Sequence, residues 1–191
     1  GLSTDIQTPF SPDFVWIKDR SNARNHYLID TVRGNDKTLI SNATDAEYTL
    51  TNTITSFNSD GYTILNNAAV NNSGETYVGW SWRGSDSAAV SNTDGTITST
   101  VSANTDSGFS VVTYTGTGAN ATVGHGLGNG ITTSKGMIII KRKDATSNWA
   151  VYHPDTSNAN WYLQLNTPSA QIGDATVFRD NPTAGTIVLG T

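Results

Sequence analysis

The sequence predicts an all-β fold built from antiparallel strands. The composition is rich in Thr, Ser, Asn and Gly and poor in helix-forming residues, a mixture that suits exposed strand faces and tight turns. Short runs of β-branched and aromatic residues alternate with turn signals along the chain. Five tryptophans and seven tyrosines provide bulky side chains for a core in a chain of 191 residues.

The first half of the chain contains six runs with the residues of strands. Asn58-Ser59-Asp60-Gly61 separates two of them and predicts a tight hairpin, because Asp-Gly favours left-handed turn backbone. The last run alternates with a period of two, so we expect Val78, Trp80 and Trp82 to face a core. The runs are residues 14–18, 27–32, 39–40, 53–57, 62–65 and 76–82.

The middle of the chain is expected to separate two β repeats. Residues 84–107 are poor in bulky apolar side chains and are expected to form a linker or long loop, with one thin strand at 96–101. Residues 1–83 would then form a first β repeat and residues 108–191 a second. The strand runs of the second half are residues 109–114, 137–141, 149–153, 161–165, 176–178 and 186–189.

The two halves resemble each other in the order of their features. Residues 14–20 align without gaps on residues 137–143, and residues 25–30 align on 148–153 at the same offset. This order predicts an internal repeat, as two sub-sandwiches or as one pseudo-symmetric sandwich; convergent strand composition is the alternative. Each copy lacks one strand of the other, so we expect the chain to be part of a longer repetitive protein. The apolar run 137–141 is typical of a strand covered on both faces.

Charge and cysteine content exclude several classes of protein. A net charge of −5 argues against nucleic-acid binding, which needs clustered Lys and Arg. The single basic cluster, Lys141-Arg142-Lys143, is typical of a protected strand edge. The chain has no cysteine and therefore no disulfide or thiolate chemistry. No apolar run is long enough to span a bilayer, so we expect no membrane insertion.

The sequence offers no pattern for catalysis or for a cofactor. His26, His125 and His153 lie far apart and lack metal-ligand spacing, and the aspartates occur at turns, where Asp caps backbone amides. The Gly-rich residues 116–130 lack the Lys-Ser/Thr of a phosphate loop. We therefore expect no catalytic residue, no metal and no cofactor; calcium at one of the aspartate turns and a distant pair of carboxylates for glycoside hydrolysis are the alternatives.

Three residues are candidates for ligand binding. Trp149 and Trp161 lie next to Asn-rich turns, where they could stack on sugar rings; packing in the core is the alternative for each. His125 lies within Gly124-His125-Gly126-Leu127-Gly128, where the glycines allow a sharp turn. It is expected either to contact a ligand or to cap that turn.

Several motifs together resemble a repeat family of unknown function that is common in tail-fibre-like and virion structural proteins of tailed bacteriophages. The resemblance spans nearly the whole chain, although residues 132–136 lack the apolar-Pro step usual before the second strand of the "IIIK" type. It implies a jelly-roll or concanavalin-like β-sandwich, a location in the virion tail or a surface appendage, and other virion proteins as partners. The motifs that carry it are residues 14–21, 30–34, 39–42, 55–62, 74–82, 108–116 and 123–128.

We therefore expect a non-enzymatic structural or adhesive module of a phage virion, in a tail fibre or related appendage, that contributes to host-surface recognition. A host-surface glycan is a candidate partner, and homo-oligomerisation follows by analogy with fibres. Two alternatives stay open. One is a carbohydrate-binding module of a larger adhesin or glycan-active enzyme, and the other is a capsid decoration protein.

Overall fold

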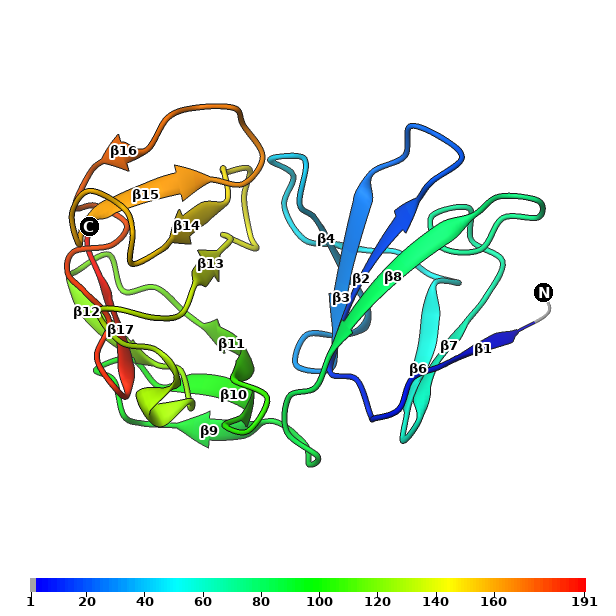
Figure 1. Ribbon diagram of the computed structural model, residues 1–191, viewed down its shortest axis with the longest axis horizontal. Helices are drawn as coiled ribbons and strands as arrows, with labels where there is room; N and C mark the ends of the chain where they lie inside the picture. Colours follow the sequence, from blue (N-terminus) through cyan, green and yellow to red (C-terminus); the bar gives the residue numbers. More distant parts are fainter. Residues whose placement is uncertain (1–2) are drawn as a thin grey trace.

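The computed structural model describes residues 3–191, and its regular secondary structure is almost entirely antiparallel strands joined by turns and loops (Figure 1). The strands form sheets of two to five members. Within the described residues the single helical element is a 3-10 turn, η1 (Gly128–Gly130). No helix among them is long and apolar enough to cross a membrane. The expected all-β class with antiparallel sheets is confirmed.

The first eight strands form two sheets, which we call together the first unit. The larger sheet has the strand order β5-β4-β3-β2-β8, and the smaller has the order β1-β7-β6. Residues 1 and 2 of the expected first repeat lie outside the described residues. The strands are β1 (Thr4–Gln7), β2 (Phe14–Asp19), β3 (His26–Asp30), β4 (Gly34–Ile40), β5 (Tyr48–Thr49), β6 (Ile54–Asn58), β7 (Gly61–Ile64) and β8 (Tyr77–Trp82).

The core of the first unit joins its two sheets. Val15 and Ile17 of β2 pack with Tyr62 and Ile64 of β7, and all four side chains are buried. Buried and half-buried residues alternate along β2, because successive side chains of a strand point to opposite faces. β6 and β7 are joined by the expected tight hairpin, in which Asn58 pairs with Gly61. The smaller sheet therefore covers one face of the larger sheet.

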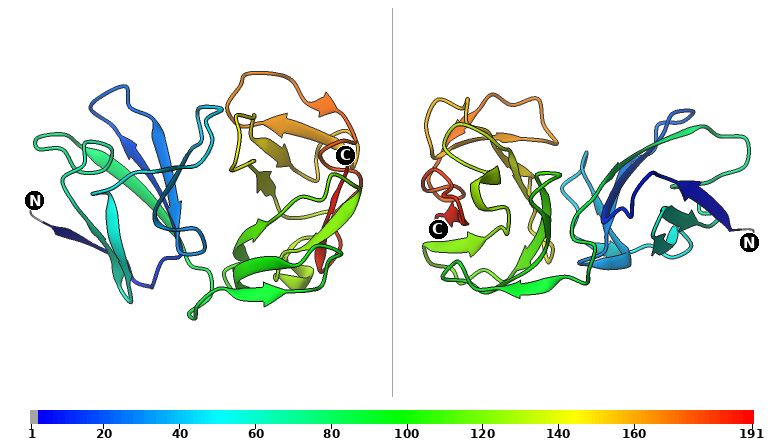
Figure 2. Two further views of the ribbon diagram at one scale, coloured as in Figure 1. Left: turned by 180° about the vertical axis from the view of Figure 1, so that it is seen from behind. Right: turned by 60° about the horizontal axis from the view of Figure 1, so that its bottom comes forward.

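The remaining strands form three sheets, which we call together the second unit; it lies beside the first in every view (Figures 1 and 2). Their orders are β11-β10-β9, β12-β17 and β13-β14-β15-β16. Tyr152 and Phe178 are the largest fully buried side chains, and their rings lie 5.7 Å apart in its core. The strands are β9 (Val90–Asn92), β10 (Ser99–Asn104), β11 (Phe109–Tyr114), β12 (Ala121–Gly124), β13 (Ile138–Ile140), β14 (Ala150–Tyr152), β15 (Trp161–Gln164), β16 (Ile172–Gly173) and β17 (Thr186–Leu189).

A buried carboxylate connects the two units at the point where the chain passes between them. Oδ2 of Asp13 accepts a hydrogen bond from the backbone N–H of Gly84 at 2.8 Å. Oδ1 accepts hydrogen bonds from the hydroxyls of Thr31 and Ser102, at 2.8 and 3.0 Å. Asp13 is 5% exposed, so these bonds compensate the cost of removing the carboxylate from water. The same group thus holds β10 of the second unit against the first.

Residues 84–107, expected as a linker or long loop, instead contain β9 and β10. β10 pairs with β11 over six residues and with β9 over three. Its buried side chains are small ones, Ser99, Val101 and Ser102, at 3% exposure or less. A strand between two neighbours is held by its backbone hydrogen bonds on both edges, so it can form without the bulky residues that usually mark a strand in a sequence. The thin strand expected at 96–101 overlaps β10, whereas β9 and the pairing of β10 on both edges were not expected.

Two expectations about buried strand faces were wrong. Trp80 and Trp82 of β8 are 45% and 37% exposed, because the opposite face of the larger sheet is the one that packs on β7. In β13 Ile138 is buried, but Ile139 is 38% exposed and the preceding Met137 is 56% exposed. The apolar run at 137–141 is therefore covered on one face only.

Candidate functional site

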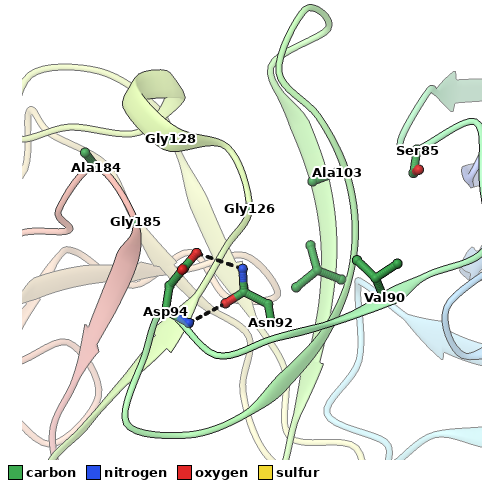
Figure 3. Close-up of a pocket in the computed structure, with 10 residues that line it drawn as sticks. Ser85, Val90, Asn92, Asp94, Ala103, Gly126, Gly128, Ala184 and Gly185 are labelled. Carbon is green, nitrogen blue, oxygen red and sulfur yellow. Dashed lines mark hydrogen bonds between the residues drawn. The ribbon is translucent and has the colours of Figure 1, made fainter.

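A depression of about 630 Å³ opens on the second unit. One side is formed by β9 and β10, and the other by backbone at Gly126, Gly128 and Gly185. Figure 3 shows Asn92 and Asp94 side by side between these walls. We call this depression the Asn92 pocket. Its other lining residues are Ser85, Val90, Val101, Ala103 and Ala184.

Asn92 and Asp94 hold each other in a fixed arrangement. The Asn92 amide donates from Nδ2 to Oδ2 of Asp94 at 2.9 Å, and Oδ1 of Asn92 accepts from the Asp94 backbone N–H at 3.0 Å (Figure 3). Asn92 also lies against Gly124, where any side chain would overlap the Asn92 amide. Both polar groups are thereby oriented without a ligand, which lowers the entropy that a ligand would have to overcome.

The wall of the pocket that contains the glycines leaves no room for a side chain at Gly126. Gly126 has a φ of +74°, a conformation that side-chain-bearing residues rarely adopt. A Cβ at Gly126 would lie 2.9 Å from both the Ala103 Cβ and the Val101 Cγ1, which is closer than such atoms approach. The wall therefore presents bare backbone close to β10.

His125 lies behind this wall and not inside the pocket. It is 1% exposed, and its Nδ1 accepts a hydrogen bond from the Leu127 backbone N–H at 3.1 Å. Nδ1 must then be unprotonated, so Nε2 carries the proton and donates it to the Thr183 carbonyl at 3.2 Å. Burial lowers the pKa of His125, which keeps the ring neutral. The residue caps the turn, which was one of its two expected roles, and ties residues 125–127 to Thr183.

Trp149 lies at the contact between the units. It is 4% exposed and packs on Leu28 and Leu39 of the first unit. Its indole N–H donates to the main-chain carbonyl of Ile40 at 2.8 Å, and the carbonyl oxygen of Ala43 lies 3.2 Å from the same nitrogen. A ring that is covered in this way has no face left for a sugar, so the placement fits the packing alternative.

Trp161 is half-buried at the start of β15. Its ring lies over the backbone of Gly173 in β16, where a Cβ would come within 2.6 Å of the Trp161 Nε1. Trp149, Trp161 and His125 belong to three different surroundings: the contact between units, the β15–β16 edge and the turn behind the pocket. The structure does not bring them together into one site.

The exposed aromatic surface lies elsewhere, on β2 and β8 of the first unit. Trp16 pairs with Trp80 and Phe14 with Trp82 across the two strands, with ring centroids 6.1 and 5.4 Å apart. Trp82 also stacks on Phe109 of β11 at 5.9 Å. The period-two pattern of residues 76–82 places Trp80 and Trp82 on one face, but it does not tell which face is exposed.

The buried carboxylates of the first unit serve its turns. Asp19 accepts hydrogen bonds from the backbone N–H groups of Ser21 and Asn22, and it forms an ion pair with Arg24 at 2.9 Å. Burial alone would raise the pKa of Asp19, but the hydrogen bonds from Ser21 and Asn22 lower it to about 2. Residues 3–191 contain no group of three or more His, Asp or Glu side chains placed to hold a metal ion.

Comparison with known proteins identifies one family. The family described as a domain of unknown function, DUF7483, matches residues 2–191, and the chain therefore belongs to it. No curated protein matches the chain, and no solved structure does.

Proposed function

We propose that this member of the DUF7483 family is a non-enzymatic structural and adhesive module of a phage virion, part of a tail fibre or related appendage that contributes to host-surface recognition. The structural role is supported by the hydrogen bonds of Asp13 and Trp149, which join the two units. A rigid body transmits position and force between its neighbours better than two tethered domains do. The virion location rests on the resemblance of the sequence motifs to phage tail-fibre repeats.

The two units are, we infer, copies of one repeat. Lys18, which follows the apolar residues of β2, donates to the carbonyl oxygens one and four residues later, Asp19 and Asn22. Lys141 donates in the same way to Arg142 and Ala145. The lysine closes the turn after the strand in both places.

A second pair of contacts supports the same inference. Oδ1 of Asn42 accepts from the His26 backbone N–H, and Nδ2 of Asn42 donates to Asn25. Asn166 makes the same two bonds, with the Trp149 N–H and with Asn148. Together with the matching orders β4-β3-β2 and β15-β14-β13, these bonds favour two sub-sandwiches of jelly-roll or concanavalin-like type.

The virion proposal is tested on intact particles. Mass spectrometry of purified particles should detect the parent protein, and gold-labelled antibody should mark the tail or its fibres at several copies per site. Several copies would provide the avidity that weak host contacts need. Homo-oligomers and contacts to other virion proteins are expected there. A parent protein found free and absent from particles would overturn the virion part of the proposal, whereas labelling of the capsid shell would favour a decoration protein.

Carbohydrate binding is the second candidate, and the Asn92 pocket favours it. Sugar hydroxyls both donate and accept, which matches a carboxylate beside an amide, and Val90 and Val101 offer apolar contact to C–H groups. Among the residues that line the pocket Asp94 is the one carboxylate, whereas hydrolysis of a glycosidic bond typically uses two. The arrangement therefore suits recognition of a glycan better than its cleavage.

A glycan array with the purified chain tests this second candidate. Glycans that bind the parent chain should lose at least tenfold in affinity with Asp94→Ala, because a buried sugar hydroxyl would lose its acceptor. The matched control is Asp155→Ala, which removes a carboxylate that is 91% exposed outside the pocket. Equal binding by parent and Asp94→Ala would exclude the pocket as the glycan site.

A further inference from the structure

β2 and β13 occupy equivalent places in the two units but differ in their neighbours. β2 pairs with β3 over five residues and with β8 over six, so both of its edges are used. β13 pairs with β14 over three residues, and among the described residues no strand pairs with its other edge. The N–H and C=O groups on that edge are free to bond an incoming strand.

We propose that the free edge of β13 is a docking site for an extended strand of a partner polypeptide other than a second copy of this chain, paired antiparallel as β8 pairs with β2. The proposal rests on the repeat relationship of the two units and not on an adhesive role. Strand addition of this kind uses the main chain for affinity and alternate side chains for specificity.

The apolar surface beside this edge defines one feature of the partner. Ile139 and Met137 stand where Trp16 and Phe14 stand in the first unit, and both are exposed. In the first unit Trp80 and Trp82 of β8 lie beside those two aromatic residues. Cross-strand neighbours lie about 5 Å apart, so a partner with bulky apolar residues at positions i and i+2 would cover Ile139 and Met137.

The sequence of β13 points in the same direction. A continuous run of apolar residues is typical of a strand that is covered on both faces. Met137 and Ile139, which an incoming strand would adjoin, are 56% and 38% exposed. A partner strand would remove part of this apolar surface from water, which is the main source of binding free energy at such sites.

Charge defines a second feature of the partner. In the first unit Glu75 lies two residues before β8 and forms an ion pair with Arg24 at 3.0 Å. At the corresponding end of β13 stand Arg142 and Lys143, both exposed. Arg142 pairs with Asp144 at 2.7 Å and Lys143 lies 4.0 Å from Glu47, so an incoming acidic residue would compete with or add to these ion pairs. An acidic residue shortly before the docking strand would therefore be attracted to that end, which fixes the antiparallel direction. The partner is thus an acidic residue followed by a strand with alternate aromatic side chains.

A synthetic peptide with the sequence of residues 75–84 serves as the probe, because it has both features. It is added to the whole chain while amide hydrogen exchange is followed by mass spectrometry. We expect exchange at residues 137–141 to slow at least fivefold in a saturable manner, since the added ladder would protect these amides. A peptide carrying Val78→Pro should give no protection, because the residue opposite Lys18 in β8 directs its N–H at the neighbouring strand and proline cannot donate.

Two substitutions in the chain distinguish docking at β13 from non-specific apolar contact. Ile139→Lys places a charge next to the incoming strand and should weaken peptide binding at least tenfold. Leu165→Lys is the matched control: Leu165 is also 38% exposed, but it follows β15, two strands from the edge, so binding should be unchanged. The proposal is overturned if saturating peptide leaves exchange at 137–141 unaltered. Concentration-dependent protection without peptide would also overturn it, in favour of pairing between two copies of the chain.

Discussion

The indole N–H of Trp149 in the second unit donates to the main-chain carbonyl of Ile40 in the first unit, across 109 residues of sequence. Around this bond the Trp149 ring packs on Leu28 and Leu39, which form the outer face of the larger sheet. Contacts between residues so distant in sequence form only when both units have folded. The bond therefore couples the stabilities of the two units.

Trp149→Ala should destabilise the chain by about 3–5 kcal/mol, the usual cost of removing a buried aromatic ring. Trp149→Phe should cost less, about 1–3 kcal/mol, because it keeps much of the packing but leaves the Ile40 carbonyl without its donor. Urea unfolding followed by far-ultraviolet circular dichroism measures both values. Trp80→Ala serves as the control: that ring is 45% exposed, and its loss should cost clearly less than the loss of Trp149. Equal losses for the two alanine variants would show that Trp149 does not join the units.

Asp13→Asn tests the other connection between the units. The substitution replaces one acceptor oxygen with an amide N–H₂, which can only donate. The one remaining oxygen cannot accept from Gly84, Thr31 and Ser102 together. We expect a loss of about 1–3 kcal/mol in the free energy of unfolding and faster proteolysis of residues 84–90. Asp60→Asn changes an exposed turn aspartate and should stay within about 0.5 kcal/mol of the parent. Unchanged stability and proteolysis would rule out a structural role for the Asp13 carboxylate.

Local patterns in the sequence predicted β2, β3, β6, β7 and β8 of the first unit and the end of β4, but they missed β1 and β5. Val15 and Ile17 alternate with half-buried residues in β2, and the Asn58–Gly61 turn closes the expected hairpin. Both features depend on residues that are near one another in sequence. The exposure of Trp80 was predicted wrongly, because alternation shows which residues share a face but not which face is covered.

The candidate site could be predicted less well from the sequence than the strands of the first unit. Asn92 and Asp94 occur in a stretch without bulky residues, and the pocket forms only because β10 brings them against residues 126–128 and 184–185. His125 lies in the turn that its flanking glycines predict, but its side chain is held by the Thr183 carbonyl, 58 residues away. Such partners are brought together by tertiary packing, for which a single sequence gives no signal.

Lowering the pH should reveal how much Asp19 contributes to the stability of the folded chain. Its pKa is lowered to about 2 in the folded chain, against an ordinary value of 3.8 for an exposed aspartate. The folded state therefore binds fewer protons than the unfolded state between these values, so the contribution is present above about pH 4 and is lost as the pH falls towards 2. The difference in thermal midpoint between the parent and Asp19→Asn should thus shrink from pH 5 to pH 2. A difference in thermal midpoint that stays flat for Asp19→Asn would contradict the assignment.

The opposite kind of group, a buried neutral base, should limit stability at mildly acidic pH. Burial lowers the pKa of His125 below its ordinary value of 6.5, so the unfolded state takes up a proton more readily than the folded state. Stability from this residue is fully present above about pH 6.5 and decreases as the pH falls below it. Two-dimensional NMR of the imidazole groups should show His125 protonated on Nε2 alone at pH 7.5, with Nδ1 free to accept from Leu127. His125→Asn should be less stable than the parent at pH 7.5, and this difference should narrow at pH 5. An imidazole of His125 that titrates at or above pH 6.5 would mean that the ring is solvated and that the turn behind the Asn92 pocket is open.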